Sequence, residues 1–497
     1  MIQELDADAV VEYFRGKNIL ITGSTGFLGK VLVEKILRVQ PYVKKLFLLV
    51  RALDDGFAKQ RIQTEVTGNK IFGILKEKYG DGFEDFIQEK ICPLPGDIIY
   101  DNLGLDNAQL TELFEHIDII VNGAATTNFF ERYDVAFDSK VLGAKHVCKF
   151  AKNCAKLKML VHVSTAYVFG EQEGLQLEKP FLMGQTLKGG THVDIESELK
   201  LIQDTWRELK ENCSSEGAEK KTMKELGLKR AREFGWPNTY VFTKAMGEML
   251  LGHLRGELPV VIFRPSIITS ILKEPLPGWT EGVRTIDSVI IAYARQTLSF
   301  FLADLDSIMD VIPGDIVVNA MMVTMAAHSK EHAQTIYHLT SSLRNPANYS
   351  LLADSFHRYF LHNPPSSTKN GKPMRLKRMH FFSTVTRFQV YMAVKYKLPL
   401  QILHLANIAL CGVLSRRYKE LNRKYNYIML LIELYAPYTL YKGCFDDMNT
   451  ERLRMRMKKK EQDKNGACHF YFDPKSIDWG DYFYRIHIPG AIKYLTN

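Results

Sequence analysis

The sequence has few of the residues that would point to a secreted, disulfide-stabilised or metal-binding protein. Its seven cysteines are an odd number, and no two of them form a Cys-x-x-Cys pair. Dispersed cysteines of this kind favour free thiols in a reducing compartment and disfavour a zinc site. We therefore expect a protein of the cytosolic side of the cell that binds no metal.

Targeting signals and long apolar segments are also scarce. The N-terminal stretch MIQELDADAVVEYFRGK is acidic and has no apolar run, so we expect neither a secretory signal nor a transit peptide. The most apolar stretch, residues 398–415, contains Pro399, Gln401 and Asn407 and is shorter than the ~20 residues that span a bilayer. We expect it to form a buried helix or one that lies at an interface.

The charge balance is basic, with a formal net charge of +9 at pH 7. A net charge of this size helps to keep a protein soluble, and it also attracts polyanions such as a phosphorylated cofactor, a CoA-type substrate or an anionic membrane. The sequence contains no zinc-finger, homeodomain or RRM signature, so we expect no nucleic-acid partner.

The chain length and the hydrophobic pattern indicate two domains. Short aliphatic runs such as residues 18–22, 46–50 and 260–263 alternate with helical stretches, which is typical of an α/β fold with a Rossmann-type, doubly wound parallel sheet. We expect this domain over residues 1–360, a linker over 361–395 and a mainly helical domain over 396–497. The linker begins in a loop rich in proline and serine at residues 363–377, and a charged stretch at 196–232 is expected to form exposed helices.

The clearest local motif is NILITGSTGFLGK at residues 18–30, in which three glycines are spaced three apart. It follows an apolar strand and opens a helix, which is the context that a dinucleotide-binding turn needs. Glycines allow the backbone to approach a pyrophosphate, and the helix N-terminus supplies amide donors. The expected cofactor-binding residues of this turn are Gly23, Thr25, Gly26, Phe27, Leu28 and Gly29.

Three further positions are candidates for cofactor contacts. Arg51 directly follows the second strand, where NAD-preferring folds usually place an acidic residue, and its guanidinium suits a 2′-phosphate. This favours NADPH, although Asp54 and Asp55 nearby are also compatible with an ordinary surface arginine. Asp97 could accept from the adenine amino group or simply belong to a turn. Ala124 follows another strand and is small enough to let the cofactor lie close to the backbone.

A Tyr-x-x-x-Lys pair on a helix places a phenol and an ammonium on one face, where the lysine can tune the tyrosine as an acid. The spacing occurs five times, at Tyr13, Tyr240, Tyr391, Tyr438 and Tyr471. The context selects Tyr240 and Lys244, because they lie between two predicted strands of the sheet. The strand at residues 159–164 ends in hydroxyl residues, of which Thr165 is the first choice to hold a substrate carbonyl and Ser164 is the near alternative.

Several longer segments resemble alcohol-forming fatty acyl-CoA reductases, and plant members of that family most of all. They include NGAATTNFFERYD, HVSTAYV, WPNTYVFTKAMGE, DVIPGDIVVNA, FDDMNTERLR and FDPKSIDWGDYF. The resemblance spans essentially the whole chain. It includes the helical tail that the family knows as its male sterility C-terminal domain, which generic dehydrogenases lack.

The resemblance implies reduction of a long-chain acyl-CoA by NADPH to a primary fatty alcohol through an aldehyde. It implies that Arg264 closes over the cofactor or the polar end of the substrate. It also implies wax or related lipid synthesis at the cytosolic face of the endoplasmic reticulum, with peripheral membrane contact through residues 398–415.

One departure from the family pattern keeps two other functions open. Where the family usually has asparagine in Ile-Asn-x-x-Gly, this chain has Lys140, which either disturbs the proton path or points outward. The alternatives are a catalytically silent paralogue that binds NADPH or acyl-CoA, and another extended short-chain dehydrogenase that acts on a nucleotide sugar, a steroid or a polyphenol.

Overall fold

The computed structural model of the chain describes residues 5–328, 333–365, 377–457 and 470–496. Its centre is a seven-stranded parallel sheet in the order β11-β7-β5-β4-β1-β2-β3. The strands are β1 (Asn18–Thr22), β2 (Lys45–Val50), β3 (Ile91–Pro95), β4 (Ile119–Asn122), β5 (Met159–Val163), β7 (Val260–Pro265) and β11 (Gln334–Leu339). The strand order reverses between β1 and β4, and such a reversal opens a ligand crevice beyond the carboxyl ends of the strands.

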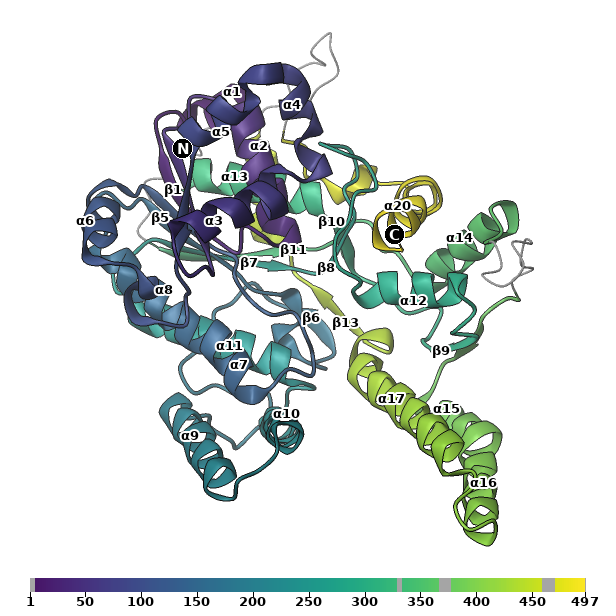
Figure 1. The fold of residues 1–497 in the computed structure, drawn as a ribbon. Helices are drawn as coiled ribbons and strands as arrows, with labels where there is room; N and C mark the ends of the chain where they lie inside the picture. The colour runs from purple at the N-terminus through teal and green to yellow at the C-terminus, as the bar shows by residue number, and fades with distance from the viewer. Residues whose placement is uncertain (1–4, 329–332, 366–376, 458–469, 497) are drawn as a thin grey trace.

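Helices cover both faces of the sheet, as a buried parallel sheet requires (Figure 1). Consecutive strand residues supply two separate cores: Ile19 and Ile21 face one, and Leu20 faces the other. The first face carries α1 (Ala7–Tyr13), α2 (Phe27–Val39) and α13 (Gly314–Ala327); the second carries α6 (Asn107–His116), α8 (Gly143–Asn153) and α11 (Thr239–Leu254). The predicted Rossmann-type fold is therefore confirmed.

The remaining elements connect these layers. Between the strands of the N-terminal half lie α3 (Asp55–Arg61), α4 (Gly73–Tyr79), α5 (Phe83–Lys90), α7 (Tyr133–Phe137), α9 (Ile195–Glu211) and α10 (Glu216–Glu233). Beyond β7 follow α12 (Thr285–Ala294), α14 (Tyr349–His362), α15 (Val385–Met392), α16 (Leu398–Ala409), α17 (Ser415–Thr439), α18 (Met448–Arg456), α19 (Trp479–Asp481) and α20 (Ile488–Leu495). Three two-stranded parallel pairs join β6 (Gly174–Gln176), β8 (Ile267–Thr269), β9 (Phe300–Leu302), β10 (Val311–Pro313), β12 (His380–Phe382) and β13 (Gly443–Phe445).

The C-terminal region is mainly helical, as expected, but its last part shares the core of the nucleotide-binding sheet. Strand β13 pairs with β6, and α18 packs against β11. Leu453, Trp479 and Phe483 lie in the same buried cluster as the residues of β1 and α2. The boundaries at residues 360 and 396 stay predictions, and residues 366–376 of the expected linker loop lie outside the described residues.

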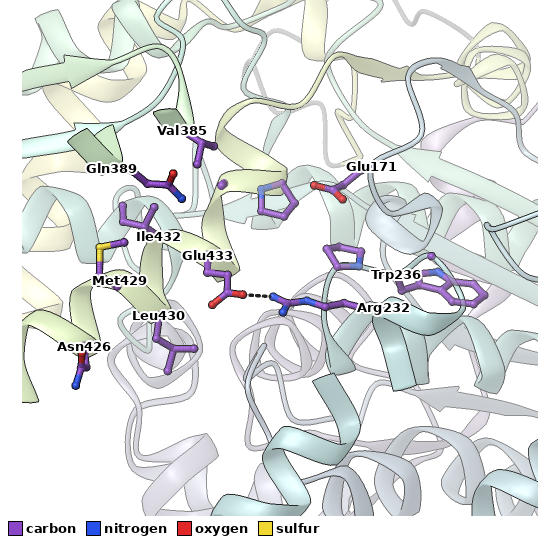
Figure 2. A pocket seen from close by; sticks show the side chains of 14 residues that line it. Glu171, Arg232, Trp236, Val385, Gln389, Asn426, Met429, Leu430, Ile432 and Glu433 are labelled. Atoms are coloured by element: carbon purple, nitrogen blue, oxygen red, sulfur yellow. Dashed lines mark ion pairs between the residues drawn. The ribbon is translucent and has the colours of Figure 1, made fainter. Parts of the chain in front are cut away.

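Helices α15, α16 and α17 project from the rest of the chain as a hairpin (Figure 1). The C-terminal half of α17 borders a cleft of about 780 Å³ whose opposite wall contains Trp236, just before α11. Figure 2 shows this cleft and the ion pair that spans it, in which Arg232 lies 2.7 Å from Glu433. The ion pair ties the hairpin to the end of α10.

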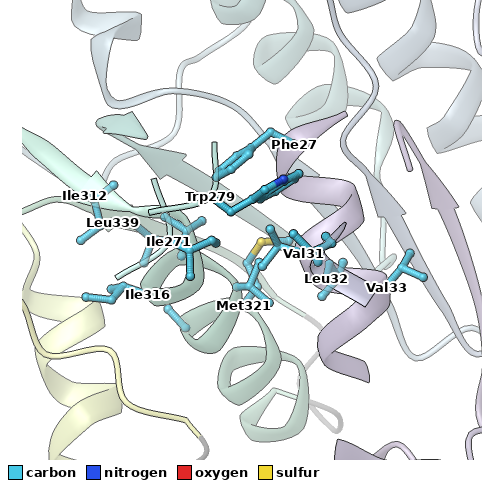
Figure 3. Packing of buried hydrophobic residues seen from close by; sticks show 14 of the residues in the cluster. Phe27, Val31, Leu32, Val33, Ile271, Trp279, Ile312, Ile316, Met321 and Leu339 are labelled. Carbon is cyan, nitrogen blue, oxygen red and sulfur yellow. The ribbon is translucent and has the colours of Figure 1, made fainter. Parts of the chain in front are cut away.

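The core beneath the glycine motif is built from aromatic and aliphatic side chains of distant segments (Figure 3). The ring of Phe27 stacks on Trp279 with centroids 5.1 Å apart, and Val31 and Met321 pack beside them. A Cβ at Gly314 would lie 2.5 Å from the Phe27 ring, so the start of α13 can approach α2 only because that residue is glycine. This packing fixes the start of α2 against the sheet.

Two expectations about apolar and charged segments have different outcomes. Residues 196–232 form α9 and α10, as predicted. Residues 398–409 form α16 and none of its residues is buried, so of the two arrangements expected for this stretch, buried or at an interface, the buried one was wrong. Within the described residues, no helix is long and apolar enough to cross a membrane.

The buried ion pair between Arg264 of β7 and Glu248 of α11 predicts a large stability effect. Replacing Arg264 by leucine leaves the Glu248 carboxylate inside the protein without its cation, and we expect the free energy of unfolding to fall by about 3–5 kcal/mol. Urea unfolding followed by circular dichroism measures this loss. The control Lys424→Ala breaks an exposed pair with Glu420 and should change stability little; equal effects of the two variants would contradict the prediction.

Candidate active site

The glycine turn connects β1 to α2 at the point where the strand order reverses. A Cβ at Gly23 would lie 2.7 Å from the backbone nitrogen of Ala124, and one at Gly29 would lie 2.3 Å from the Gly23 carbonyl oxygen. Glycine is therefore required at the first position by the neighbouring strand end and at the third by the turn itself. No side chain of the described residues caps α2 at Gly26, so the amide groups of its first turn are free to bind an anion.

A hydrogen-bond chain fixes the crevice between β1 and β4. The Thr22 hydroxyl donates to the Asn122 side chain at 2.8 Å and accepts from the Ala124 backbone amide at 3.1 Å. These bonds hold the loop after β4 against the glycine turn. Ala124 thus shapes the crevice through its backbone.

Tyr240 and Lys244 lie on α11, whose first turn is capped by Asn238. The ammonium of Lys244 donates to the Val163 carbonyl at the end of β5, at 2.6 Å. Thr165 follows that strand and is hydrogen-bonded to Tyr240. The structure thus brings together Thr165, Tyr240 and Lys244, as the sequence predicts.

Burial controls the acid–base properties of this group. It raises the pKa of Tyr240 to about 12, although the positive charge of Arg284 and the hydrogen bond to Thr165 act in the opposite direction. Burial also lowers the pKa of Lys244 to about 8, against the attraction of Glu248. Tyr240 is therefore protonated and able to donate at neutral pH, while Lys244 changes its protonation state close to neutral pH.

A cavity of about 980 Å³ joins the glycine turn to the catalytic residues. Gly23, Gly26, Ser164, Tyr240 and Lys244 line its polar end. The rest of its wall is largely apolar and aromatic, and includes Phe129, Ile267, Phe300, Phe301, Phe356, Phe381, Leu431 and Tyr435. One space therefore combines a polar reaction centre with room for a long apolar ligand.

The sequence reasoning did not identify this apolar wall. Apart from Phe129, which lies in the loop after β4, its residues come from β8, β9, β12, α12, α14 and α17, most of which are far from the motifs in sequence. Its link to the catalytic helix is direct, because the Asn238 side chain donates to the Tyr438 hydroxyl at 2.7 Å. Helical periodicity in α17 was the available signal, but it did not reveal which face would meet the active site.

Two cations of the cavity wall were also missed. Arg284 precedes α12 and acts electrostatically on Tyr240, and Lys224 of α10 lies over the Phe130 ring at 5.0 Å. Both line the same cavity as the catalytic residues. They are candidates to bind the phosphate groups of a ligand.

The other predicted cofactor residues have varied positions. Arg51 is exposed directly after β2, and a carboxylate oxygen of Asp97 accepts from the Ile99 amide at 3.2 Å. Thr25 belongs to the glycine turn. Arg264 is fully buried, binds Glu248 and His338, and lies outside the residues that line the cavity. In this structure Arg264 contacts Glu248 and His338, and the closing role over the cofactor or substrate that the resemblance implied stays a prediction.

Comparison with known proteins decides which family has this arrangement. A family model for the NAD-binding part of male sterility proteins matches residues 21–321, and a second male sterility protein model matches residues 395–497. Fatty acyl-CoA reductase 1 of Arabidopsis thaliana is 50% identical over 490 residues, which cover 98% of this chain and 99% of that protein. The chain belongs to the fatty acyl-CoA reductase family.

Further comparisons agree with this assignment. The alcohol-forming fatty acyl-CoA reductase of Simmondsia chinensis is 46% identical to this reductase over 98% of the chain and 99% of its own length. Among solved structures, the reductase domain of a nonribosomal peptide synthetase from Mycobacterium tuberculosis covers 99% of the chain with a TM-score of 0.56. The alignment includes 96% of that domain, at 19% identity, so this likeness concerns the fold alone.

The site of this reductase fits a nicotinamide dinucleotide. The Ser164 hydroxyl lines the cavity and is buried without a hydrogen-bond partner in the described parts of the chain. Buried polar atoms normally have partners, so this hydroxyl is suited to meet a polar group of a ligand. The described residues contain no cluster of three or more His, Cys, Asp or Glu side chains that could hold a metal ion.

The tight approach at Gly29 predicts a loss of cofactor binding in Gly29→Ala. The new methyl group collides with the Gly23 carbonyl and displaces the turn, and we expect binding of the nicotinamide cofactor to weaken by about tenfold or more. Titration of nicotinamide fluorescence measures this change. Gly73→Ala in α4 is the control, because a Cβ there meets nothing within 4 Å; unchanged affinity in Gly29→Ala would refute the role of the turn.

Proposed function

We propose that this reductase converts a long-chain fatty acyl-CoA to a primary fatty alcohol through an aldehyde, with NADPH as reductant. The observation that carries the proposal is the single cavity that joins the Tyr240–Lys244 pair to a long apolar wall. The family relatives named as fatty acyl-CoA reductases support it. The overall reaction consumes two NADPH and two protons and releases free CoA, two NADP⁺ and the alcohol.

The side chains of the site have separate roles in both reductions. A bound nicotinamide supplies hydride to the carbonyl carbon. Thr165, or the neighbouring Ser164, and Tyr240 donate hydrogen bonds to the carbonyl oxygen as negative charge develops on it. In the first reduction the carbon–sulfur bond then breaks, and the thiolate leaves and takes a proton. In the second, Tyr240 gives its proton to the aldehyde oxygen, and Lys244 stabilises the tyrosinate that remains.

The preference for NADPH is proposed on the position of Arg51. The residue is exposed at the carboxyl end of β2, where an adenosine ribose lies in folds of this type. A guanidinium there pairs well with a 2′-phosphate. Arg284 and Lys224 are proposed to contact the phosphates of the acyl-CoA, because both are cations that line the cavity.

The Tyr240→Phe variant tests the reaction and its acid together. Purified protein in mild detergent is incubated with NADPH and acyl-CoAs of graded length, and the products are measured by gas chromatography. We expect fatty alcohol from the wild type and at least a 100-fold lower rate from the variant, because the proton donor is lost. NADH in place of NADPH tests the cofactor preference.

Tyr391→Phe is the matched control for this experiment. Tyr391 and Lys395 have the same spacing as the catalytic pair and share a hydrogen bond of 2.6 Å, but they lie on the projecting hairpin. This variant should keep wild-type activity. Tight NADPH binding without alcohol or aldehyde at any chain length would refute the reductase proposal and support the catalytically silent alternative.

We also propose that α16 binds the surface of a membrane, specifically the cytosolic face of the endoplasmic reticulum. Leu398, Ile402 and Leu405 are spaced along one side of the helix and are each more than half exposed. Exposed basic residues flank the helix on both sides, at Lys397 and Arg416. Apolar side chains between cations suit insertion at an anionic lipid interface.

Vesicle flotation tests this surface. Leu405→Asp places a charge among the exposed apolar residues, and we expect it to lower binding to phosphatidylcholine vesicles that contain phosphatidylserine by about tenfold. Leu53→Asp, at a residue that is 91% exposed in a loop after β2, should leave binding unchanged. Equal binding of wild type and Leu405→Asp would refute the proposal.

A further inference from the structure

Lys140 is a buried amine beside the catalytic tyrosine. It lies in the turn of π-helix at Asp138–Leu142, which packs against α11. Its side chain is only 2% exposed, and its nitrogen lies 5.3 Å from the centre of the Tyr240 ring. Of the two orientations that the sequence left open, the structure therefore has the inward one.

The contact between the turn and α11 leaves Lys140 little freedom to turn outward. A Cβ at Gly247 would lie 2.4 Å from the Lys140 carbonyl oxygen, so the backbone of the turn lies directly on the catalytic helix. The lysine nitrogen has no hydrogen-bond partner in the described parts of the chain. A buried ammonium without a partner lowers the stability of the fold, so its position next to Tyr240 suggests a functional role.

The charges around Lys140 oppose one another. Lys244 from α11 disfavours its protonated form, and Glu131 from the loop before α7 favours it. A carboxylate oxygen of Glu131 also accepts a hydrogen bond from the Arg132 backbone amide. Several other charges nearby are paired elsewhere: Arg132 with Asp134, Lys145 with Glu196, His146 and Lys149 with Asp101, and Glu248 with Arg264. Asp138 lies in the same turn as Lys140, and burial, with repulsion from Asp134 and Asp97, raises its pKa to about 6.

We propose that Lys140 is a positioning residue of the proposed reductase reaction that controls the acidity of Tyr240 through the proton that it carries. The protonated amine attracts the tyrosine ring and stabilises the tyrosinate formed when Tyr240 gives its proton to the substrate oxygen. The neutral amine does neither. The site thus has two titrating amines on one tyrosine, Lys244 and Lys140.

The two amines titrate within the physiological range. Burial, followed by repulsion from Lys244, lowers the pKa of Lys140 to about 7. The pKa of Lys244 is about 8. As pH rises from 6 to 9, Lys140 loses its proton, and its support of Tyr240 disappears with that proton.

The pH dependence of a single reductive step tests the proposal. Reduction of a long-chain fatty aldehyde by NADPH is measured in single turnover from pH 6 to 9 for wild type, Lys140→Met and Lys140→Gln. We expect both variants to be slower than wild type by about tenfold at pH 6 and to approach the wild-type rate near pH 9. An equal loss at every pH would mean that Lys140 only fills space, and an unchanged profile would mean that it has no role; either result overturns the proposal.

Thermal unfolding gives a readout that does not depend on the reaction. An unfolded lysine keeps its proton up to about pH 10.5, whereas folded Lys140 loses it near pH 7, so its destabilising effect is complete below pH 7 and fades as pH rises toward 10.5. The melting temperature of Lys140→Met relative to wild type should therefore be highest near pH 6.5 and fall toward pH 9.5. Any packing loss from the substitution is the same at all pH values and cancels in this trend.

A matched control separates this effect from the loss of any buried lysine. Lys90 is 9% exposed and pairs with Glu89 at the end of α5. Lys90→Met should show the wild-type dependence of rate on pH. If the melting trend appears but neither the wild type nor any variant reduces the aldehyde, the proposed function fails, while the burial of a titrating amine stands. If Lys140→Met does not show the melting trend, the inference itself is overturned.

Discussion

The hydrogen bond from Lys244 to the Val163 carbonyl is the interaction on which the active site depends. It joins the catalytic helix α11 to the carboxyl end of β5, so that Tyr240 lies over Thr165 at the edge where ligands bind in such sheets. Because the ammonium is buried, the bond also sets the electrostatics of the site. The buried pair of Arg264, in β7, and Glu248 supports the same helix one turn further along.

The C-terminal region completes a site that the nucleotide-binding sheet only begins. Asn238 both caps α11 through the Val241 amide and donates to the Tyr438 hydroxyl of α17. One side chain therefore fixes the start of the catalytic helix and the apolar wall at the same time. A substitution in α17 that moves Tyr438 will consequently affect the position of Tyr240 through Asn238 as well as through the cavity wall.

The parts of the fold that local sequence determines were predictable. Strand β1 spans the predicted residues 18–22, and α2 begins directly after the glycine turn as the motif predicts, because an apolar strand, a glycine turn and an amphipathic helix are each set by neighbouring residues. Tyr240 and Lys244 could be chosen among five equal spacings because the flanking strands were recognisable. The inward orientation of Lys140 and the aromatic wall from β9, β12, α14 and α17 depend on contacts between segments that are far apart in the sequence. The exposure of α16 follows from the projection of its hairpin away from the rest of the chain (Figure 1). No periodicity encodes such contacts, and for this reason they appeared only in the structure.

The apolar cavity and the acid–base chemistry impose opposite requirements on the same residues. A wall that excludes water favours an acyl chain, since burial of each methylene contributes about 0.8 kcal/mol. The same exclusion of water raises the pKa of Tyr240, which makes the tyrosine proton harder to give. It also lowers the pKa of Lys244. Positive charge close to the phenol compensates without readmitting water, as the hydrogen bond to Thr165 does. Arg284 supplies part of this charge. An additional buried amine over the Tyr240 ring is consistent with a site in which a long apolar wall reaches the proton donor itself.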